Sequence, residues 1–217
     1  MSSSTNRSSV GPRRARWLDA PNTAGSGCKM PPAMDRLESL LDAVKKARAP
    51  EGVETRIVGI DGPGGAGKST LAAWLASELP AAAIVHTDDF ASWDNPINWW
   101  PMLIEQALEP LASGRVARYE PTAWAGEERA AVVIEPGGTV LLEGVTATRS
   151  AFRPYLAYSI WLESDRAVRL QRGIDRDGEE ARAQWERWMA AEDRYIEAEQ
   201  PADHVDLVLP GDRDLWR

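Results

Sequence analysis

The sequence is poor in the residues that form disulfides or bind transition metals. Its 217 residues include one cysteine, Cys28, and two histidines, His86 and His204. A single cysteine excludes an intrachain disulfide framework, and two distant histidines are too few for a histidine-based metal cluster. This composition fits a reducing compartment, so we expect a cytoplasmic protein.

Long apolar runs and excess positive charge are also missing. No apolar run reaches the roughly 18 residues that a membrane-spanning helix needs, and the basic N-terminus lacks the hydrophobic stretch of a signal peptide. Lys and Arg number 25 against 33 Asp and Glu, which gives a net charge of −8. An acidic surface repels a polyphosphate backbone. Neither a membrane nor nucleic acid is therefore an expected partner.

The chain divides by composition into a tail and one domain. Residues 1–33 are rich in Ser, Arg, Gly and Pro and show no apolar period, which predicts a disordered tail. The tail could be an interaction arm, a targeting peptide or a dispensable extension. The remainder, 34–217, is long enough for one substantial core.

The apolar pattern of the domain predicts an α/β fold. An amphipathic helix begins at Met34, and five nearly continuous apolar runs predict buried parallel strands at 55–61, 81–87, 139–144, 158–163 and 205–209. Helices are expected at 68–79, 98–113, 165–176 and 179–199, on both faces of the sheet. Residues 115–135 lack helical period and predict two short strands, a small β insertion.

A glycine-rich run follows the first of these strands. Residues 62–69 match G-x-x-x-x-G-K-[ST], with a strand before them and an apolar helix after them. Glycine lets backbone N–H groups converge on phosphate oxygens, Lys68 can reach the β- and γ-phosphates, and Ser69 can bind Mg²⁺. The predicted nucleotide-binding residues are Gly62, Gly64, Gly65, Ala66, Gly67, Lys68, Ser69 and Thr70. The pattern indicates a P-loop NTPase fold that uses ATP and Mg²⁺; the alternative is a flexible glycine linker.

Acidic residues at the ends of two strands are candidates for phosphoryl transfer. Asp88, in "HTDDF" (86–90), is the candidate general base, although Asp88 or Asp89 could instead cap the next helix. Glu143, in "VLLEGV", could hold Mg²⁺ or its water shell, or be a solvated strand end. The chain has no N-K-x-D segment for guanine selection and no L-S-G-G-Q signature, which favours a small-molecule kinase.

Arginines and tryptophans complete the candidate site. Arg169, Arg172 and Arg176 lie at helical spacing within 165–180 and could form a lid over ATP; the alternative is a solvated helix face. The chain has ten tryptophans against two phenylalanines. Such residues could line an acceptor pocket or simply pack a core. The tryptophans and tyrosine considered for that pocket are Trp93, Trp99, Trp100, Tyr119, Trp124, Trp185 and Trp188.

Together these segments resemble the uridine kinase group of P-loop kinases, which includes phosphoribulokinase-like enzymes, from about residue 55 to 178. "GPGGAGKST" is similar to the group's phosphate loop, "TDDF" to its D-x-F motif, "LLEGV" to its E-G strand end, and "RLQRGIDRD" to its lid pattern. "WDNPINW" resembles its D-H-P segment and "RYEP" its Y-D segment. The resemblance implies a five-stranded parallel sheet and Asp88 as the base. It also implies substrate contacts from Asp94, Tyr119 and Arg129, beside Trp93.

Two departures concern the acceptor side of this pattern. The histidine expected after the Tyr segment is missing, and the D-H-P histidine is Asn95. We therefore expect an ATP- and Mg²⁺-dependent kinase that acts on a small-molecule hydroxyl, with the 5′-hydroxyl of a pyrimidine nucleoside as the first candidate. The alternatives are a kinase of another sugar or small alcohol, and an ATP-binding regulatory protein that transfers nothing.

Overall fold

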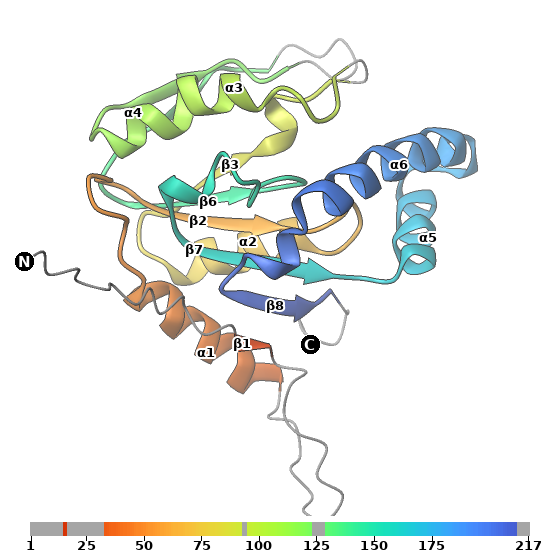
Figure 1. Ribbon diagram of the computed structural model, residues 1–217, viewed down its shortest axis with the longest axis horizontal. Helices are drawn as coiled ribbons and strands as arrows, with labels where there is room; N and C mark the ends of the chain where they lie inside the picture. The colour runs from red at the N-terminus through yellow and green to blue at the C-terminus, as the bar shows by residue number, and fades with distance from the viewer. Residues whose placement is uncertain (1–14, 17–32, 93–94, 123–128, 212–217) are drawn as a thin grey trace, which may run out of the picture.

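The computed structural model describes residues 15–16, 33–92, 95–122 and 129–211. A parallel sheet lies at its centre, with helices on both sides (Figure 1). Five strands follow the order β8-β7-β2-β6-β3, and every neighbouring pair among them is parallel. They are β2 (Arg56–Asp61), β3 (Ala83–His86), β6 (Thr139–Glu143), β7 (Leu156–Glu163) and β8 (Leu207–Pro210). The predicted five-stranded parallel sheet is confirmed.

A sixth, two-residue strand lies beside β8. β1 (Ala15–Arg16) pairs parallel with β8, with Ala15 opposite Leu207. It falls within the predicted tail, and its sequence gives no strand signal, because backbone pairing with an open sheet edge requires no side-chain pattern. Residues 1–14 and 17–32 lie outside the described residues, so their disorder stays a prediction.

Helices cover both faces of the sheet. α1 (Ala33–Lys46) and α2 (Lys68–Glu78) pack on one face, while the segment from α3 (Trp100–Leu103) to α4 (Glu109–Ala112) packs on the other. α5 (Arg166–Asp177) and α6 (Arg182–Glu199) lie at the carboxyl end of the strands (Figure 1). Short 3-10 turns complete the chain as η1 (Thr87–Asp89), η3 (Arg153–Tyr155), η4 (Glu179–Ala181) and η5 (Pro201–Asp203).

The helix predicted at 98–113 is interrupted by a π turn. Between α3 and α4 lies η2 (Ile104–Leu108), where the backbone N–H of Glu109 donates to the carbonyl of Ile104. Pro110 follows at once and has no N–H to continue the regular i to i−4 pattern. The proline accounts for the local change of helix type, and the segment as a whole remains helical.

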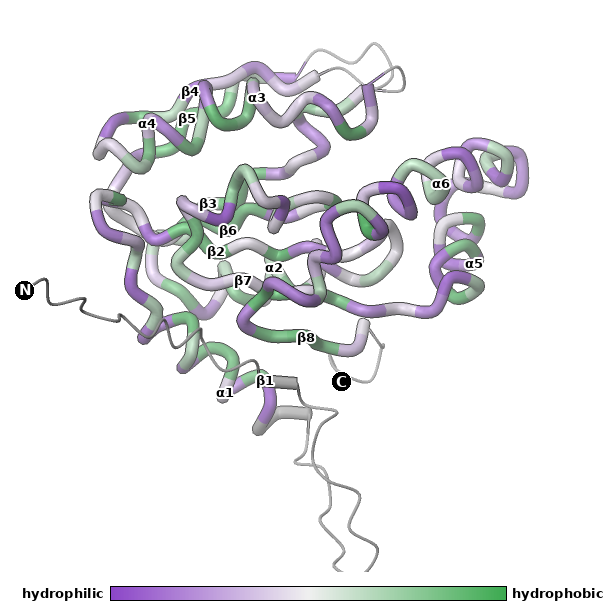
Figure 2. The backbone as a smooth tube through the Cα atoms, viewed as in Figure 1, coloured by the Kyte–Doolittle hydropathy of each residue, from purple (hydrophilic) through white to green (hydrophobic). Residues whose placement is uncertain are grey.

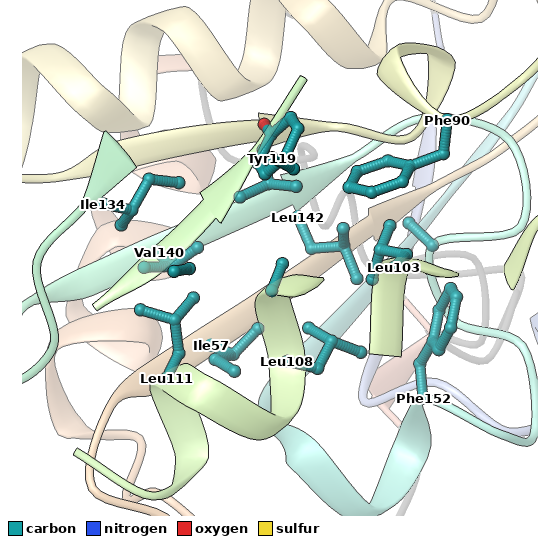
Figure 3. Close-up of a cluster of buried hydrophobic side chains, with 14 of the residues drawn as sticks. Ile57, Phe90, Leu103, Leu108, Leu111, Tyr119, Ile134, Val140, Leu142 and Phe152 are labelled. Carbon is teal, nitrogen blue, oxygen red and sulfur yellow. The ribbon is translucent and has the colours of Figure 1, made fainter. Parts of the chain in front are cut away.

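Side chains alternate across the strands and so build two cores. Ile57 and Leu142 face the α3–α4 side, and Val58 and Leu141 face α1 and α2; all four are fully buried. Figure 3 shows the core on the α3–α4 side, around Leu142. Figure 2 shows that β8 is predominantly hydrophobic, whereas α6 has many hydrophilic positions. This double burial explains why the strands are apolar without alternation.

The predicted β insertion is present as an antiparallel pair. β4 (Ala117–Tyr119) pairs with β5 (Val132–Ile134), and Tyr119 lies opposite Val132. Residues 123–128, with Trp124 among them, lie outside the described residues. Across the described ranges, no helix combines the length and apolarity needed to cross a membrane.

The two-sided core makes a direct prediction about stability. Leu142→Ala should lower the free energy of unfolding by about 2–5 kcal/mol, because a fully buried side chain is replaced by a cavity. Val133→Ala is the matched control, because Val133 is 52% exposed and should change stability by less than about 0.5 kcal/mol. Denaturant unfolding followed by circular dichroism measures both, and equal effects would contradict the packing described here.

Candidate active site

The glycine-rich run forms a loop between β2 and α2. Three of its glycines have positive φ: 147° at Gly62, 77° at Gly65 and 95° at Gly67. L side chains rarely adopt these angles, and a Cβ at Gly62 would lie 2.6 Å from the carbonyl oxygen of Leu162. Glycine is therefore required by the backbone itself. The loop leads directly into the N-terminus of α2, where backbone N–H groups and the helix dipole favour an anion.

Two polar side chains of α2 follow the loop. Lys68 is 8% exposed, and its Nζ donates to the carbonyl oxygen of Pro63 at 3.1 Å. The lysine thus folds back over the loop that it follows. The Ser69 hydroxyl points to β6, where it donates to Glu143, 3.2 Å from Oε1 and 3.4 Å from Oε2.

A cavity of about 680 Å³ opens beside this loop. Eight of the predicted site residues line it, from five parts of the chain: Gly64, Gly65, Lys68, Ser69, Asp88, Arg129, Glu143 and Arg176. Trp185 and Trp188 of α6 form part of its wall. The cavity lies at the carboxyl ends of the strands, the edge at which open parallel sheets bind ligands.

Glu143 is a buried carboxylate within this cavity wall. It is 5% exposed, which excludes the solvated strand end, and its Oε1 lies 2.5 Å from Nδ1 of His86. Burial opposes its ionisation, but the contacts with His86 and Ser69 and the charge of Lys68 lower the pKa of Glu143 below its ordinary value. In return, the hydrogen bond with Glu143 raises the pKa of His86. Glu143 is therefore held as an anion.

The adjacent acids Asp88 and Asp89 face different surroundings. Asp88 lines the cavity and is solvent-exposed there, whereas Asp89 is 2% exposed. The protein around Asp88 partly desolvates its carboxylate and raises its pKa, against the charge of Lys68. Both acids lie in η1, and the next described helix, α3, begins only at Trp100. Neither of them caps that helix.

Asp89 binds two residues of the insertion. Its Oδ1 accepts from Nη1 of Arg129 at 2.5 Å and its Oδ2 from the Tyr119 hydroxyl at 3.2 Å. Tyr119 is 3% exposed and packs in the core cluster, with its ring centroid 4.6 Å from that of Phe90 (Figure 3). Burial and Asp89 raise the pKa of Tyr119. The structure thus places Tyr119 in the core, and Arg129 reaches the cavity wall.

The three arginines predicted to form a lid have different partners. Nη1 of Arg169, which is 5% exposed, donates to Oε2 of Glu192 at 3.2 Å. Nη1 of Arg172 donates to the carbonyl oxygens of Gly65 and Gly211, both at 2.9 Å. These two arginines attach α5 to the phosphate loop and to the segment after β8. Of the three, only Arg176 lines the cavity beside the glycine-rich loop. The sequence had predicted the same role, a lid over ATP, for all three.

Two buried acids near the loop were not predicted. Asp61, the last residue of β2, accepts from the backbone N–H of Gly62 at 2.7 Å and from the Tyr195 hydroxyl at 2.6 Å. Glu192 of α6 is fully buried and accepts from the backbone N–H of Gly64 at 2.9 Å. The sequence contains a sign of the role of Asp61, because a carboxylate at the end of an apolar strand is buried and must find hydrogen-bond donors. The sequence gives no comparable sign for Glu192, because it lies in a helix with many other charged residues.

The other predicted residues lie around the loop. Ala66 is fully buried in the core beneath it, Gly67 is the N-cap of α2, and Thr70 lies in its first turn. The predicted substrate residues Trp93 and Asp94 lie outside the described residues.

Comparison with known proteins shows that the fold is similar to those of two solved structures. The chain is similar in structure to a "possible uridine kinase" from Bacillus stearothermophilus, with a TM-score of 0.60, 20% sequence identity, and coverage of 81% of this chain and 98% of the other. It is also similar to a "putative fructose transport system kinase" from Silicibacter sp. TM1040, with a TM-score of 0.57, 22% identity, and coverage of 80% and 98%. Neither a protein-family model nor a curated protein matches the chain. The likeness establishes the α/β fold that this chain shares with the two structures.

The contrast between Asp88 and Asp89 can be tested through stability. Asp89→Asn should lower the free energy of unfolding by about 1–3 kcal/mol, because asparagine keeps only one acceptor oxygen for the two donors, Tyr119 and Arg129. Asp88→Asn should not lower this free energy, because Asp88 faces the cavity and desolvation already disfavours its charged form. Thermal and denaturant unfolding of both variants measure this difference, and a larger loss in Asp88→Asn would reverse the two assignments.

Proposed function

We propose that this chain is an ATP- and Mg²⁺-dependent kinase that transfers the γ-phosphoryl group of ATP to a hydroxyl of a small molecule. The observation that carries the proposal is the single cavity shared by the phosphate loop, Lys68, Ser69, Asp88 and Arg176. It combines a polyphosphate site, a carboxylate for the acceptor proton, and positive charge for the transferred group, which are the parts that phosphoryl transfer needs.

The residues around Ser69 fit a magnesium ion. Mg²⁺ prefers oxygen ligands and retains several waters, and the hydroxyl of Ser69 and the ionised carboxylate of Glu143 lie together at the cavity wall. Ser69 would bind the ion directly, and Glu143 would bind it or its water shell. When bound, Mg²⁺ neutralises charge on the phosphate oxygens. His86 holds the Glu143 carboxylate in place.

The reaction assigned to the other residues is a single displacement. Asp88 accepts the proton of the acceptor hydroxyl, whose oxygen forms a bond to the γ-phosphorus. The bond between that phosphorus and the bridging oxygen of ADP breaks, and the electron pair leaves with ADP. Lys68 and Arg176 stabilise the charge on the transferring group, and the loop amides hold the remaining phosphates.

A second cavity, which reaches Pro63 of the phosphate loop, gives room for the rest of the nucleotide. Its volume is about 940 Å³, and its lining includes Pro63, Trp161, Arg172 and Gly211. The guanidinium of Arg172 can stack on a base. We assign this cavity to the base and ribose of ATP, which leaves the cavity of Asp88 for the acceptor.

Two acceptor classes are supported by the comparisons and the wall of the cavity. The pyrimidine nucleoside remains the first candidate, by the likeness to a possible uridine kinase. A sugar is the second, because the other neighbour is described as a kinase of fructose transport and because Tyr119, expected beside a nucleobase, lies in the core. The acceptor wall retains Trp185 and Trp188, which can contact either a base or the apolar face of a sugar.

The proposal predicts the behaviour of two variants. With Mg·ATP and a panel of nucleosides, sugars and amino alcohols, at least one compound should accelerate ADP release by the wild type. Asp88→Asn should lower that stimulated rate by about 10²–10⁴ and leave ATP binding intact. Lys68→Ala should weaken ATP binding and lower the rate, whereas Lys46→Ala, on the exposed surface of α1, should change neither.

The panel separates the candidate functions. Stimulation by uridine or cytidine supports a nucleoside kinase, and stimulation by fructose or another sugar moves the acceptor to that class. Tight ATP binding without stimulation by any compound would contradict the kinase and favour a regulatory ATP-binding protein. A stimulated rate that is equal in Asp88→Asn and the wild type would remove Asp88 as the base.

The pKa of Asp88 adds a prediction on pH. A general base works only when deprotonated, and partial desolvation raises the pKa of Asp88 above its ordinary value of 3.8. The value of kcat/KM should therefore fall as the pH drops through the raised pKa of Asp88. This fall should occur at a higher pH than an ordinary aspartate would give. The fall should disappear in Asp88→Asn, whose residual rate should not depend on pH in that range.

A further inference from the structure

Arg176 is held at the cavity wall by its neighbour in the chain. Its Nε donates to Oδ1 of Asp177 at 2.7 Å, and its Nη2 donates to Oδ2 at 2.8 Å, a bidentate ion pair. The side chain is otherwise 71% exposed. An exposed arginine without such a partner loses considerable rotamer entropy when it engages a ligand. The ion pair therefore limits the directions in which the guanidinium can point.

Trp185 contacts both members of this ion pair. Its Nε1 donates to Oδ2 of Asp177 at 2.9 Å, and the guanidinium carbon of Arg176 lies 5.4 Å from the centroid of its ring. A cation at this distance from an indole is attracted by the ring. The indole thus orients Asp177 through its N–H group and Arg176 through its face.

The position of Trp185 is fixed by backbone rather than by flexible side chains. A Cβ on Gly173 of α5 would collide with the indole, and a Cβ on Gly64 of the phosphate loop would lie 3.1 Å from its Cζ3. Gly178, with φ of 91°, ends α5 and starts the turn that brings α6 back against it. The ring therefore fits closely between the lid helix and the phosphate loop.

This arrangement leaves Arg176 able to bind an anion. A guanidinium has five N–H donors, and the structure gives two of them to Asp177. Arg176 itself lines the cavity, together with Lys68 and the loop glycines Gly64 and Gly65. A phosphoryl group on the loop is the anion that this cavity suits best.

We propose that Asp177 and Trp185 are positioning residues that hold Arg176 toward the transferred γ-phosphoryl group. The inference rests on the proposed function, since it assumes that a nucleoside triphosphate binds the phosphate loop. It gives Trp185 a role in orienting Arg176 in addition to its place in the cavity wall.

The test is a double-mutant cycle on nucleotide binding, which needs no acceptor. The β,γ-imido analogue of ATP and ADP, each with Mg²⁺, are titrated by calorimetry into the wild type, Arg176→Ala, Asp177→Asn and the double variant. Arg176→Ala should weaken binding of the triphosphate analogue about tenfold and leave ADP binding unchanged. Asp177→Asn should weaken it at least about threefold when Arg176 is present and have no effect in the Arg176→Ala background.

Two further variants separate positioning from folding. Trp185→Phe keeps an aromatic ring but removes the N–H donor. Its affinity for the triphosphate analogue should therefore lie between that of the wild type and that of Asp177→Asn. Asp193→Asn is the matched control, because Asp193 accepts from Arg166 of α5 in a different exposed ion pair. It should bind both nucleotides like the wild type.

The outcomes distinguish the inference from the function on which it rests. A wild type that binds neither nucleotide contradicts the proposed function. A wild type that binds both, with Asp177→Asn equally harmful in the two backgrounds, contradicts positioning through Arg176. Tighter binding of the triphosphate analogue by Asp177→Asn would also overturn the inference, because Asp177 would then compete with phosphate for the guanidinium.

Discussion

The candidate site depends on one buried carboxylate. Asp61 accepts hydrogen bonds from the backbone N–H groups of Gly62, Thr146 and Thr148 and from the hydroxyls of Thr148 and Tyr195. These donors belong to the phosphate loop, the segment after β6, and α6. A single residue at the end of β2 therefore sets how the loop leaves the sheet and where α6 crosses it. Removal of such a partner leaves several buried donors unsatisfied.

A second buried carboxylate extends this connection to the lid. Glu192 binds the backbone of Gly64 and the side chain of Arg169, and Arg172 binds the carbonyl oxygen of Gly65. The lid helix is thus attached to the phosphate loop without any ligand. Arg176 differs from the other two arginines, because its partner is Asp177 and its surroundings are the cavity. In the candidate site, most polar side chains hydrogen-bond one another or the backbone, and a few charged groups, such as Asp88 and Arg176, face the cavity.

The sequence predicted the fold and the glycine-rich loop between β2 and α2 because these rest on local rules. Apolar runs mark strands that are buried on both faces, and the positive φ angles at Gly62 and Gly65 explain the glycines that the motif requires. It could not separate Asp88 from Asp89, because the difference arises from Tyr119 and Arg129 in a distant insertion. Nor could spacing assign the arginines, whose partners, such as Glu192, lie elsewhere in the chain. Contacts between distant elements decide which polar residues are structural and which face the cavity.

The central claim is phosphoryl transfer from ATP to a carbon-bound hydroxyl, and phosphorus NMR of the reaction mixture tests it most directly. With the protein, Mg·ATP and the acceptor panel, the account predicts loss of the γ-phosphate resonance and growth of a new phosphomonoester resonance in step with ADP. Growth of inorganic phosphate alone, or an unchanged ATP spectrum with every compound, would contradict it.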